Sequence, residues 1–266
     1  MKFFDIHTHI YPDAIAGKAV NNLNAFYSFV CAGKGTADDL IPAEKEAHSA
    51  GCLILGVATA PKQVSHVNTF LSLLCRTQTT DSFQVRAFGC IHQDSENIPA
   101  IVDDIEKQGL CGVKLHPDIQ GVNIDDNRLM PLYECMEGRM PVAFHMGDDR
   151  EEYRFSTAER LVRIKKRFPK LEVIAAHLGG YRAWQDSTLL ADLDGIYFDT
   201  SSTLWAMPPS EATRLIHLLG TSRILFGTDY PVAYPAEELA RFDALDLSEA
   251  ERSAILYNNA ARLLAL

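Results

Sequence analysis

The sequence contains no Cys-x-x-Cys pair and no two cysteines close together. Its six cysteines are widely separated, and most of them lie in apolar stretches such as Gly51-Cys52-Leu53-Ile54-Leu55. Unpaired cysteines inside apolar stretches behave as small core side chains. We therefore expect reduced, buried thiols in a cytosolic protein.

Long apolar runs and positive charge are also scarce. No apolar run approaches the length of a membrane-spanning helix, and no basic segment with a cleavage site precedes the first apolar run at Phe3. The 25 Lys and Arg residues face 35 Asp and Glu residues, which gives a net charge of -10. Binding to a phosphate backbone needs a basic surface. We expect a soluble, cytoplasmic protein that binds a small molecule, not nucleic acid or a membrane.

Apolar runs and helical patterns alternate along the 266 residues, of which 47% are hydrophobic. Eight runs are expected to form strands: 3–9, 52–58, 85–91, 111–115, 141–145, 171–177, 195–200 and 223–228. Helical periodicity lies between them, for example at 98–108, 129–138, 157–168 and 211–219. Eight alternations favour parallel strands with right-handed crossovers. The sequence thus predicts one (β/α)8 barrel domain over residues 1–266.

The longest gap between predicted strands is residues 10–51, which we expect to hold helices at 13–30 and 42–50. A single β/α connection does not need this length. The gap follows the first strand, so it can cover the mouth of the barrel and shape substrate choice. An apolar rim around this insertion would permit a homodimer. The last segment, 247–266, is expected to be one closing helix.

The first run contains a pair of histidines, in Phe3-Phe4-Asp5-Ile6-His7-Thr8-His9. Side chains two residues apart on a strand point to the same face, with Cα atoms roughly 6.5 Å apart. His7 and His9 can therefore bind one ion together.

Three more side chains that bind metals fall at the ends of later runs. His145 ends the fifth run, His177 the sixth and Asp229 the eighth. The carboxyl ends of barrel strands meet at one mouth, so these residues can come together with His7 and His9. Imidazole and carboxylate ligands suit Zn²⁺, with Mn²⁺, Fe²⁺ and Co²⁺ as alternatives.

A site of three histidines and one aspartate leaves a coordination position for water, whose pKa a divalent ion can lower to about 7. The fourth histidine then has another task. We expect His177 to hydrogen-bond that water or a substrate oxygen and to move a proton, because an imidazole titrates near neutral pH.

Six motifs spread over the whole chain carry a family resemblance. They are Asp5-Ile6-His7-Thr8-His9, Gly112-Val113-Lys114-Leu115-His116-Pro117, Phe144-His145-Met146-Gly147, Ala176-His177-Leu178-Gly179-Gly180, Gly227-Thr228-Asp229-Tyr230-Pro231 and Asn258-Asn259-Ala260-Ala261-Arg262-Leu263. With these the chain resembles the amidohydrolase superfamily, in the branch of metal-dependent barrel hydrolases that includes aminocarboxymuconate semialdehyde decarboxylase. The resemblance implies one divalent metal, Zn²⁺ or a similar ion, held by His7, His9, His145 and Asp229, with His177 beside the activated water.

The fourth run departs from the binuclear members of this superfamily, which use a carboxylated lysine or a glutamate there to bridge two metals. Here the run offers Lys114 and His116, which face the same way. A carboxylated Lys114 would admit a second metal. The favoured alternative is that Lys114 or His116 contacts a carboxylate or carbonyl of the substrate. Arg182 and Trp205 follow later strands and are further candidates for substrate contact, since such loops carry specificity.

Together these residues predict a metal-dependent hydrolase that directs an activated water at an amide, ester or lactone bond, with His177 and Asp229 sharing proton transfer. A nonoxidative decarboxylase of a small carboxylic acid would use the same ligands. A deoxyribonuclease-like barrel would need a glutamate on the fourth strand and a less acidic surface. The non-enzymatic alternative is an inactive metal-binding scaffold, which a site with an open coordination position disfavours.

Overall fold

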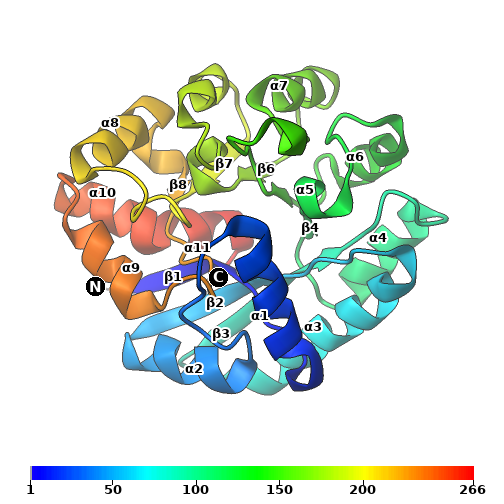
Figure 1. Ribbon diagram of the computed structural model, residues 1–266, viewed down its shortest axis with the longest axis horizontal. Helices are drawn as coiled ribbons and strands as arrows, with labels where there is room; N and C mark the ends of the chain where they lie inside the picture. The colour runs from blue at the N-terminus through cyan, green and yellow to red at the C-terminus, as the bar shows by residue number, and fades with distance from the viewer. Residues whose placement is uncertain (1) are drawn as a thin grey trace.

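The structure of the protein is a computed structural model, in which residues 2–266 are described. Eight parallel strands pair in the order in which they occur in the chain, as the sequence predicts. Their bounds are β1 Phe3–Thr8, β2 Ser49–Leu55, β3 Gln84–Cys90, β4 Val113–Leu115, β5 Val142–Phe144, β6 Val173–Ala175, β7 Ile196–Asp199 and β8 Ile224–Leu225. The predicted (β/α)8 barrel is confirmed, and Figure 1 shows its helices arranged around the strands.

The first strand and the segment after β8 complete the barrel. The amide of Ile6 donates to the carbonyl of Phe226 at 2.9 Å, and the amide of Asp229 donates to the carbonyl of His7 at 2.8 Å. Thr8 also forms a parallel bridge with Tyr230. These bonds hold Asp229, at the end of the eighth predicted strand, directly against His7 and His9.

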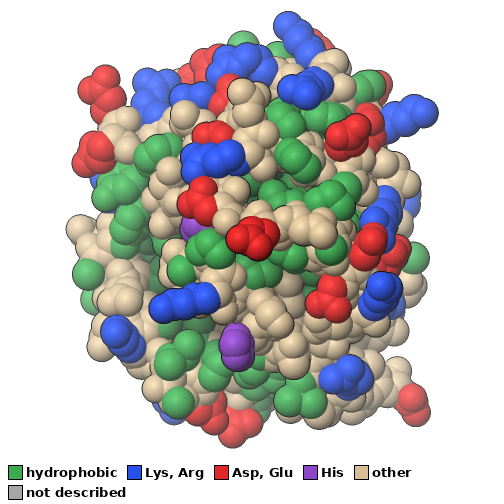
Figure 2. Space-filling model, turned by 90° about the vertical axis from the view of Figure 1, so that its right-hand side faces the viewer, with side chains coloured by type: hydrophobic (Ala, Val, Ile, Leu, Met, Phe, Trp, Pro, Cys, Tyr) green, Lys and Arg blue, Asp and Glu red, His purple; other side chains and the backbone are tan. Residues whose placement is uncertain are grey.

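Eleven α-helices occur in the described residues 2–266. They are α1 Asp13–Tyr27, α2 Ala37–Glu46, α3 Val64–Gln78, α4 Ile98–Lys107, α5 Pro117–Gln120, α6 Met130–Met136, α7 Ala158–Arg167, α8 Pro209–Leu219, α9 Pro235–Asp243, α10 Glu249–Ser253 and α11 Asn259–Leu264. None of the described helices is long and apolar enough to cross a membrane. On the face in Figure 2 basic and acidic side chains are mixed, with no continuous basic surface.

Two helix predictions were wrong in their boundaries. The helix expected at 42–50 is α2, which begins after Thr36 with two acidic residues in its first turn and contains Pro42 in its interior. Negative charge stabilises a helix N-terminus, so Asp38 and Asp39 favour the earlier start. Residues 49 and 50 belong to β2 instead, where Ser49 pairs with Phe3.

The closing helix expected at 247–266 is also divided. Helices α10 and α11 are separated by a π-helical segment, Ala254–Asn258. There the carbonyl of Ile255 accepts a hydrogen bond from the amide of Phe226 at 3.1 Å, and the Asn259 side chain donates to the carbonyl of Ile224 at 2.7 Å. Carbonyls that bond to the sheet are drawn away from regular helical bonding, which is one physical cause of such a bulge.

The core has two layers. Side chains at alternate strand positions, among them Phe4, Ile6, Leu53, Phe88 and Ala143, form an inner cluster with Ala260 and Leu264 of α11. Their neighbours in sequence, such as Val142 and Phe144, pack outward with residues of the helices. Alternation on a strand produces both layers. Helix α11 therefore plugs one end of the barrel, and the other end is left for the site.

The insertion between β1 and β2 contains the two predicted helices with different roles. Helix α2 buries Leu40 and Ile41 against the barrel, whereas only Ala16 of the fifteen residues of α1 is buried. Helix α1 ends at Tyr27 because Ser28 adopts a left-handed conformation, with φ 56°. In Figure 1 α1 lies over the opening that the strands surround.

Residues 12–34 leave and rejoin the barrel at one place, and we call them the flap. The amide of Tyr11 donates to the carbonyl of Gly35 at 2.8 Å, which ties the two ends of the flap together. The amide of Gly33 donates to the carbonyl of Pro231 at 2.9 Å, which joins the returning end to the segment after β8. The flap is thus fixed at its base next to Asp229.

Candidate metal centre

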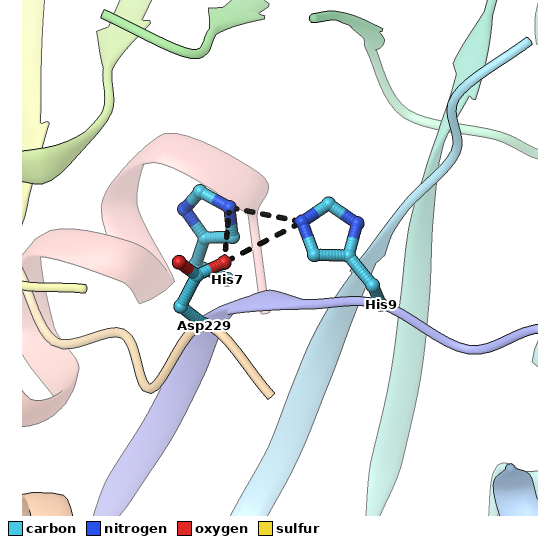
Figure 3. A group of neighbouring side chains, drawn as sticks. All are labelled: His7, His9 and Asp229. Atoms are coloured by element: carbon cyan, nitrogen blue, oxygen red, sulfur yellow. Dashed lines mark hydrogen bonds and ion pairs between the residues drawn. The ribbon is translucent and has the colours of Figure 1, made fainter. Parts of the chain in front are cut away.

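Three of the predicted ligands meet at the carboxyl end of the barrel. The Nε2 atoms of His7 and His9 lie 3.2 Å apart. The Oδ1 atom of Asp229 lies 3.3 Å from Nε2 of His7 and 3.6 Å from Nε2 of His9 (Figure 3). The second Asp229 oxygen accepts a hydrogen bond from the Ser202 hydroxyl at 2.5 Å. We call His7, His9 and Asp229 the metal group.

In both imidazoles the Nδ1 atom, which is not the nitrogen that faces Asp229, is hydrogen-bonded to an oxygen atom that can only accept. Nδ1 of His9 lies 2.9 Å from the carbonyl of Leu55, and Nδ1 of His7 lies 2.9 Å from Oδ2 of Asp199. Both Nδ1 atoms must therefore carry the proton. In the neutral rings the two Nε2 atoms are left with lone pairs, and these face each other and Asp229.

Such a convergence of acceptors fits a cation. Burial lowers the pKa of His7 to about 4, so its ring is neutral at physiological pH. Burial opposes ionisation of Asp229, but positive charge at the His7 and His9 pair holds the pKa of that carboxyl well below its usual range. Two lone pairs and one carboxylate oxygen then crowd one point with no proton between them. A divalent metal is the species that imidazole and carboxylate donors of this kind bind.

His177 stands beside the metal group with its tautomer also fixed. Its Nδ1 lies 2.9 Å from the carbonyl of Ser201, to which it must donate. The lone pair is therefore on Nε2, and the ring centre lies 5.2 Å from that of His7. Nε2 accepts a hydrogen bond from Nδ1 of His145 at 2.9 Å, and an imidazole pair joined in this way can accept and return a proton.

His145 is not drawn into the metal group among the described residues. Its Nδ1 lies 2.9 Å from Nε2 of His177, and its Nε2 lies 3.3 Å from both the Tyr27 hydroxyl and Oδ2 of Asp118. The structure thus brings three of the four predicted ligands together, and the ring of His177 lies between them and the fourth, His145. A ligand role for His145 stays a prediction.

The predicted substrate contacts divide into two pairs. Lys114 and His116 are buried at the mouth, and the ring of His116 stacks on that of His145 with centres 4.2 Å apart. The Lys114 Nζ atom has no hydrogen-bond partner within residues 2–266. Arg182 is largely exposed, 4.0 Å from Asp149, and neither it nor Trp205 lines the cavity over the metal group.

That cavity has a volume of about 240 Å³ and opens on His7, His9 and Asp229. Its walls are mainly aromatic and aliphatic: Tyr11, Leu23, Phe26, Tyr27, Phe29, Val57, Ile119, Tyr181 and Val232. Ala19, Asn22, Leu23 and Phe26, one face of α1, form its roof. Within residues 2–266 no lysine or arginine lines it.

Comparison with known proteins identifies the family of the chain. The family model described as amidohydrolase matches residues 75–266, which is most of the chain. The chain belongs to the amidohydrolase family. The predicted resemblance and the prediction of an enzyme are both confirmed. A search of curated proteins finds no match.

Several solved structures share the barrel fold of this chain. An uncharacterised TIM-barrel protein from Bordetella bronchiseptica has a TM-score of 0.80 at 20% identity, over 100% of this chain and 99% of that one. The 2,6-dihydroxybenzoate decarboxylase from Rhizobium has a TM-score of 0.74 at 16% identity, over 100% and 99%. A dihydroxybenzoic acid decarboxylase from Polaromonas with bound manganese and the inhibitor 2-nitroresorcinol has a TM-score of 0.71 at 16% identity, over 100% and 97%. At these identities the likeness shows the fold.

Asp199 is a site residue of this family member that sequence reasoning missed. It ends β7 and is fully buried, with Oδ2 against Nδ1 of His7 and Oδ1 accepting the amide of His177 at 3.0 Å. Burial opposes its ionisation, but the neighbouring His7 lowers the pKa of Asp199 to about 2. The signal was present, since an acidic residue at a strand end is the same pattern that identified Asp229.

We expect Asp199→Asn to weaken metal binding by about 10- to 100-fold, because the carboxylate orients His7 and increases the basicity of its ring. The affinity can be measured by competition with a chromogenic chelator. Asp194→Asn, at an exposed position before the same strand, is the matched control. Equal affinity in Asp199→Asn and the control would show that Asp199 does not support the metal group.

Proposed function

We propose that the chain is a metal-dependent decarboxylase of small aromatic carboxylic acids. The observation that carries this proposal is the cavity, whose aromatic and aliphatic walls open directly on the metal group. A planar ring fits such walls, and its carboxylate would reach the one point where a cation is expected. Two of the similar structures are decarboxylases of dihydroxybenzoic acids, which supports this substrate class.

His7, His9 and Asp229 would hold the metal, with His145 as a candidate fourth ligand. When bound, the metal would anchor the substrate carboxylate and supply positive charge beside the reacting carbon. The sequence favours Zn²⁺, and the manganese in the Polaromonas enzyme makes Mn²⁺ an equal candidate for testing. Both ions accept imidazole and carboxylate donors.

The residues of the chain have two tasks in this reaction. The apolar walls exclude water from the ring and keep its plane fixed. His177, whose Nε2 holds a lone pair, takes up a proton and then gives it to the ring carbon that bears the carboxylate. The bond from that carbon to the carboxyl group breaks, its electron pair forms the new C–H bond, and CO₂ leaves. Placing a proton donor beside the reacting atom is general acid catalysis.

Hydrolysis of an ester or lactone, the main prediction from the sequence, is the second candidate. The lone pair on Nε2 of His177 favours it, because the same atom can deprotonate a water molecule. Hydrolysis differs in requiring water next to the substrate, in a cavity with mainly apolar walls.

We expect protein loaded with Mn²⁺ or Zn²⁺ to release CO₂ from at least one carboxyl-labelled hydroxybenzoate, and to place one deuterium on the product ring in D₂O. Labelled CO₂ and the product can be followed by nuclear magnetic resonance and mass spectrometry. Chelator-treated protein is the control and should be inactive. Cleavage of aryl esters or lactones without CO₂ release from any acid would refute the decarboxylase and support the hydrolase.

A further inference from the structure

We propose that Tyr27, on the flap, determines substrate specificity together with His116. Their hydroxyl and imidazole would form a polar subsite, in the wall of the cavity that also holds the metal group, for an uncharged polar substituent of the substrate ring. The selected substrate would thus carry one carboxylate and at least one hydroxyl or similar group. This inference rests on the proposed function, because it assumes that a ring with a carboxylate occupies the cavity.

Tyr27 reaches from the last turn of α1 into the histidine cluster. Its hydroxyl lies 3.0 Å from Nε2 of His116 and 3.3 Å from Nε2 of His145. Both Tyr27 and His116 line the cavity. A phenol hydroxyl both donates and accepts, so a substrate hydroxyl could replace either imidazole as its partner.

The barrel side of this subsite has hydrogen-bonding capacity that the protein does not use. Nδ1 of His116, Oδ1 of Asp118 and Nζ of Lys114 are buried and have no hydrogen-bond partner within residues 2–266, and Oδ2 of Asp118 has only a contact of 3.3 Å with Nε2 of His145. These atoms come from alternate positions on and just after β4. Buried polar groups are nearly always satisfied in folded proteins, so such a cluster next to a cavity indicates a missing polar partner.

Contacts at the tip of the flap orient the Tyr27 ring. Nη1 of Arg150 donates to the carbonyl of Phe26 at 2.8 Å, and its guanidinium lies over the rings of Phe26 and Tyr27. Arg150 is itself fixed by two hydrogen bonds to Asp148, of 2.9 and 2.7 Å. Phe29 stacks on Tyr27 with ring planes 2° apart. Because α1 buries only Ala16, these contacts position the phenol more than core packing does.

Charge in the cavity limits what the subsite can bind. Among residues 2–266, Asp229 is the only Asp, Glu, Lys or Arg that lines the cavity, and the negative charge of Asp229 belongs to the metal group. Lys114 does not line the cavity, so a second substrate carboxylate would be desolvated against Tyr27 and neutral imidazoles with no cation in contact with it, which is strongly unfavourable. An uncharged hydroxyl would lose little on entry, because Tyr27 and His116 replace its water.

Size limits the substrate further. A cavity of about 150 Å³ is large enough for a benzene ring. The 240 Å³ available therefore holds a single ring with two or three small substituents. The preferred ligand is a monocyclic hydroxy acid, and a benzene dicarboxylate should be rejected.

The test is calorimetric titration of the Mn²⁺-loaded protein with benzoate, the three monohydroxybenzoate isomers and isophthalate. In the wild type, at least one hydroxy isomer should bind about 10-fold more tightly than benzoate, the ratio expected for one well-formed hydrogen bond. Isophthalate should bind no more tightly than benzoate. In Tyr27→Phe the preferred isomer should lose about 10-fold in affinity, and benzoate less than about 2-fold.

Tyr153→Phe is the matched control, since its ring packs on Phe26 outside the cavity. It should keep the wild-type preference. The inference is overturned if no probe binds, if Tyr27→Phe keeps the preference for a hydroxy isomer, or if it weakens benzoate equally. A preference lost only in Tyr27→Phe supports the subsite even when no CO₂ is released, and that result would refute the proposed function alone. CO₂ release with an unchanged preference in Tyr27→Phe would refute the subsite alone.

Discussion

Replacing Asp229 with alanine is expected to abolish metal binding and, with it, turnover. The wild type should hold about one divalent ion per chain and the variant less than about a tenth of one, because the two remaining imidazoles are too few for a stable site. The carboxylate is also the only negative charge in the metal group. The Asp229 amide hydrogen-bonds to the carbonyl of His7 and so joins β1 to the segment after β8. Plasma mass spectrometry of protein reconstituted with Mn²⁺ or Zn²⁺ measures the ion content directly.

Two controls make this measurement decisive. Asp243→Ala removes a carboxylate that does not line the cavity and has 77% of its side chain exposed, and this variant should keep the ion. Thermal unfolding of Asp229→Ala must remain cooperative, so that loss of metal is not loss of the fold. Full metal content in a folded Asp229→Ala would contradict the assignment of the metal group.

The same measurement decides the role of His145. If His145→Ala loses the ion as Asp229→Ala does, the imidazole moves from His177 to the metal when the site is loaded. If the ion is kept, His145 serves to orient His177, as its 2.9 Å contact indicates. About two ions per wild-type chain would instead implicate Lys114 as a carboxylated bridge.

The second large effect is expected in His177→Ala, which should keep its metal and lose about 10²- to 10⁴-fold in kcat, the usual range for removal of a general acid or base. The His177 ring contacts the metal group but contributes no atom to it. The Ser201 carbonyl accepts from Nδ1 and so fixes the tautomer of the ring, with the lone pair on Nε2. Metal content and kcat are measured on the same preparation. His217→Ala, at an exposed histidine paired with Glu251, should match the wild type in both. Unchanged kcat in His177→Ala would remove this residue from the mechanism.

The fold could be predicted from the sequence because strand and helix patterns each repeat eight times with few interruptions. Boundaries were harder. The start of α2 is set by Asp38 and Asp39, which stabilise the helix N-terminus, and not by Pro42. The division of the closing helix depends on the hydrogen bond between Phe226 and Ile255. The second cause lies between residues far apart in sequence, and a local pattern does not contain it.

The candidate site was predictable to the extent that it depends on strand ends. His7, His9 and Asp229 follow from that rule alone. The side-by-side arrangement of His145 and His177 depends on where Tyr27 and Asp118 lie, and no local spacing encodes this. Tyr27 gave no signal at all, because its helix lies outside the regular alternation and its reach into the barrel is a property of the folded flap.

The hydrogen bond between Tyr11 and Gly35 makes the flap a module in an evolutionary sense. Insertions and deletions between two such closely spaced attachment points leave every barrel strand in register, so the segment can be lengthened, shortened or exchanged as a unit. A lineage could in this way acquire new substrates by recombination within this one short segment, while the carboxyl end of the barrel is inherited unchanged. The same property makes the flap a natural cassette for engineering, in which a grafted segment from a relative would change ligand choice without a redesign of the metal group.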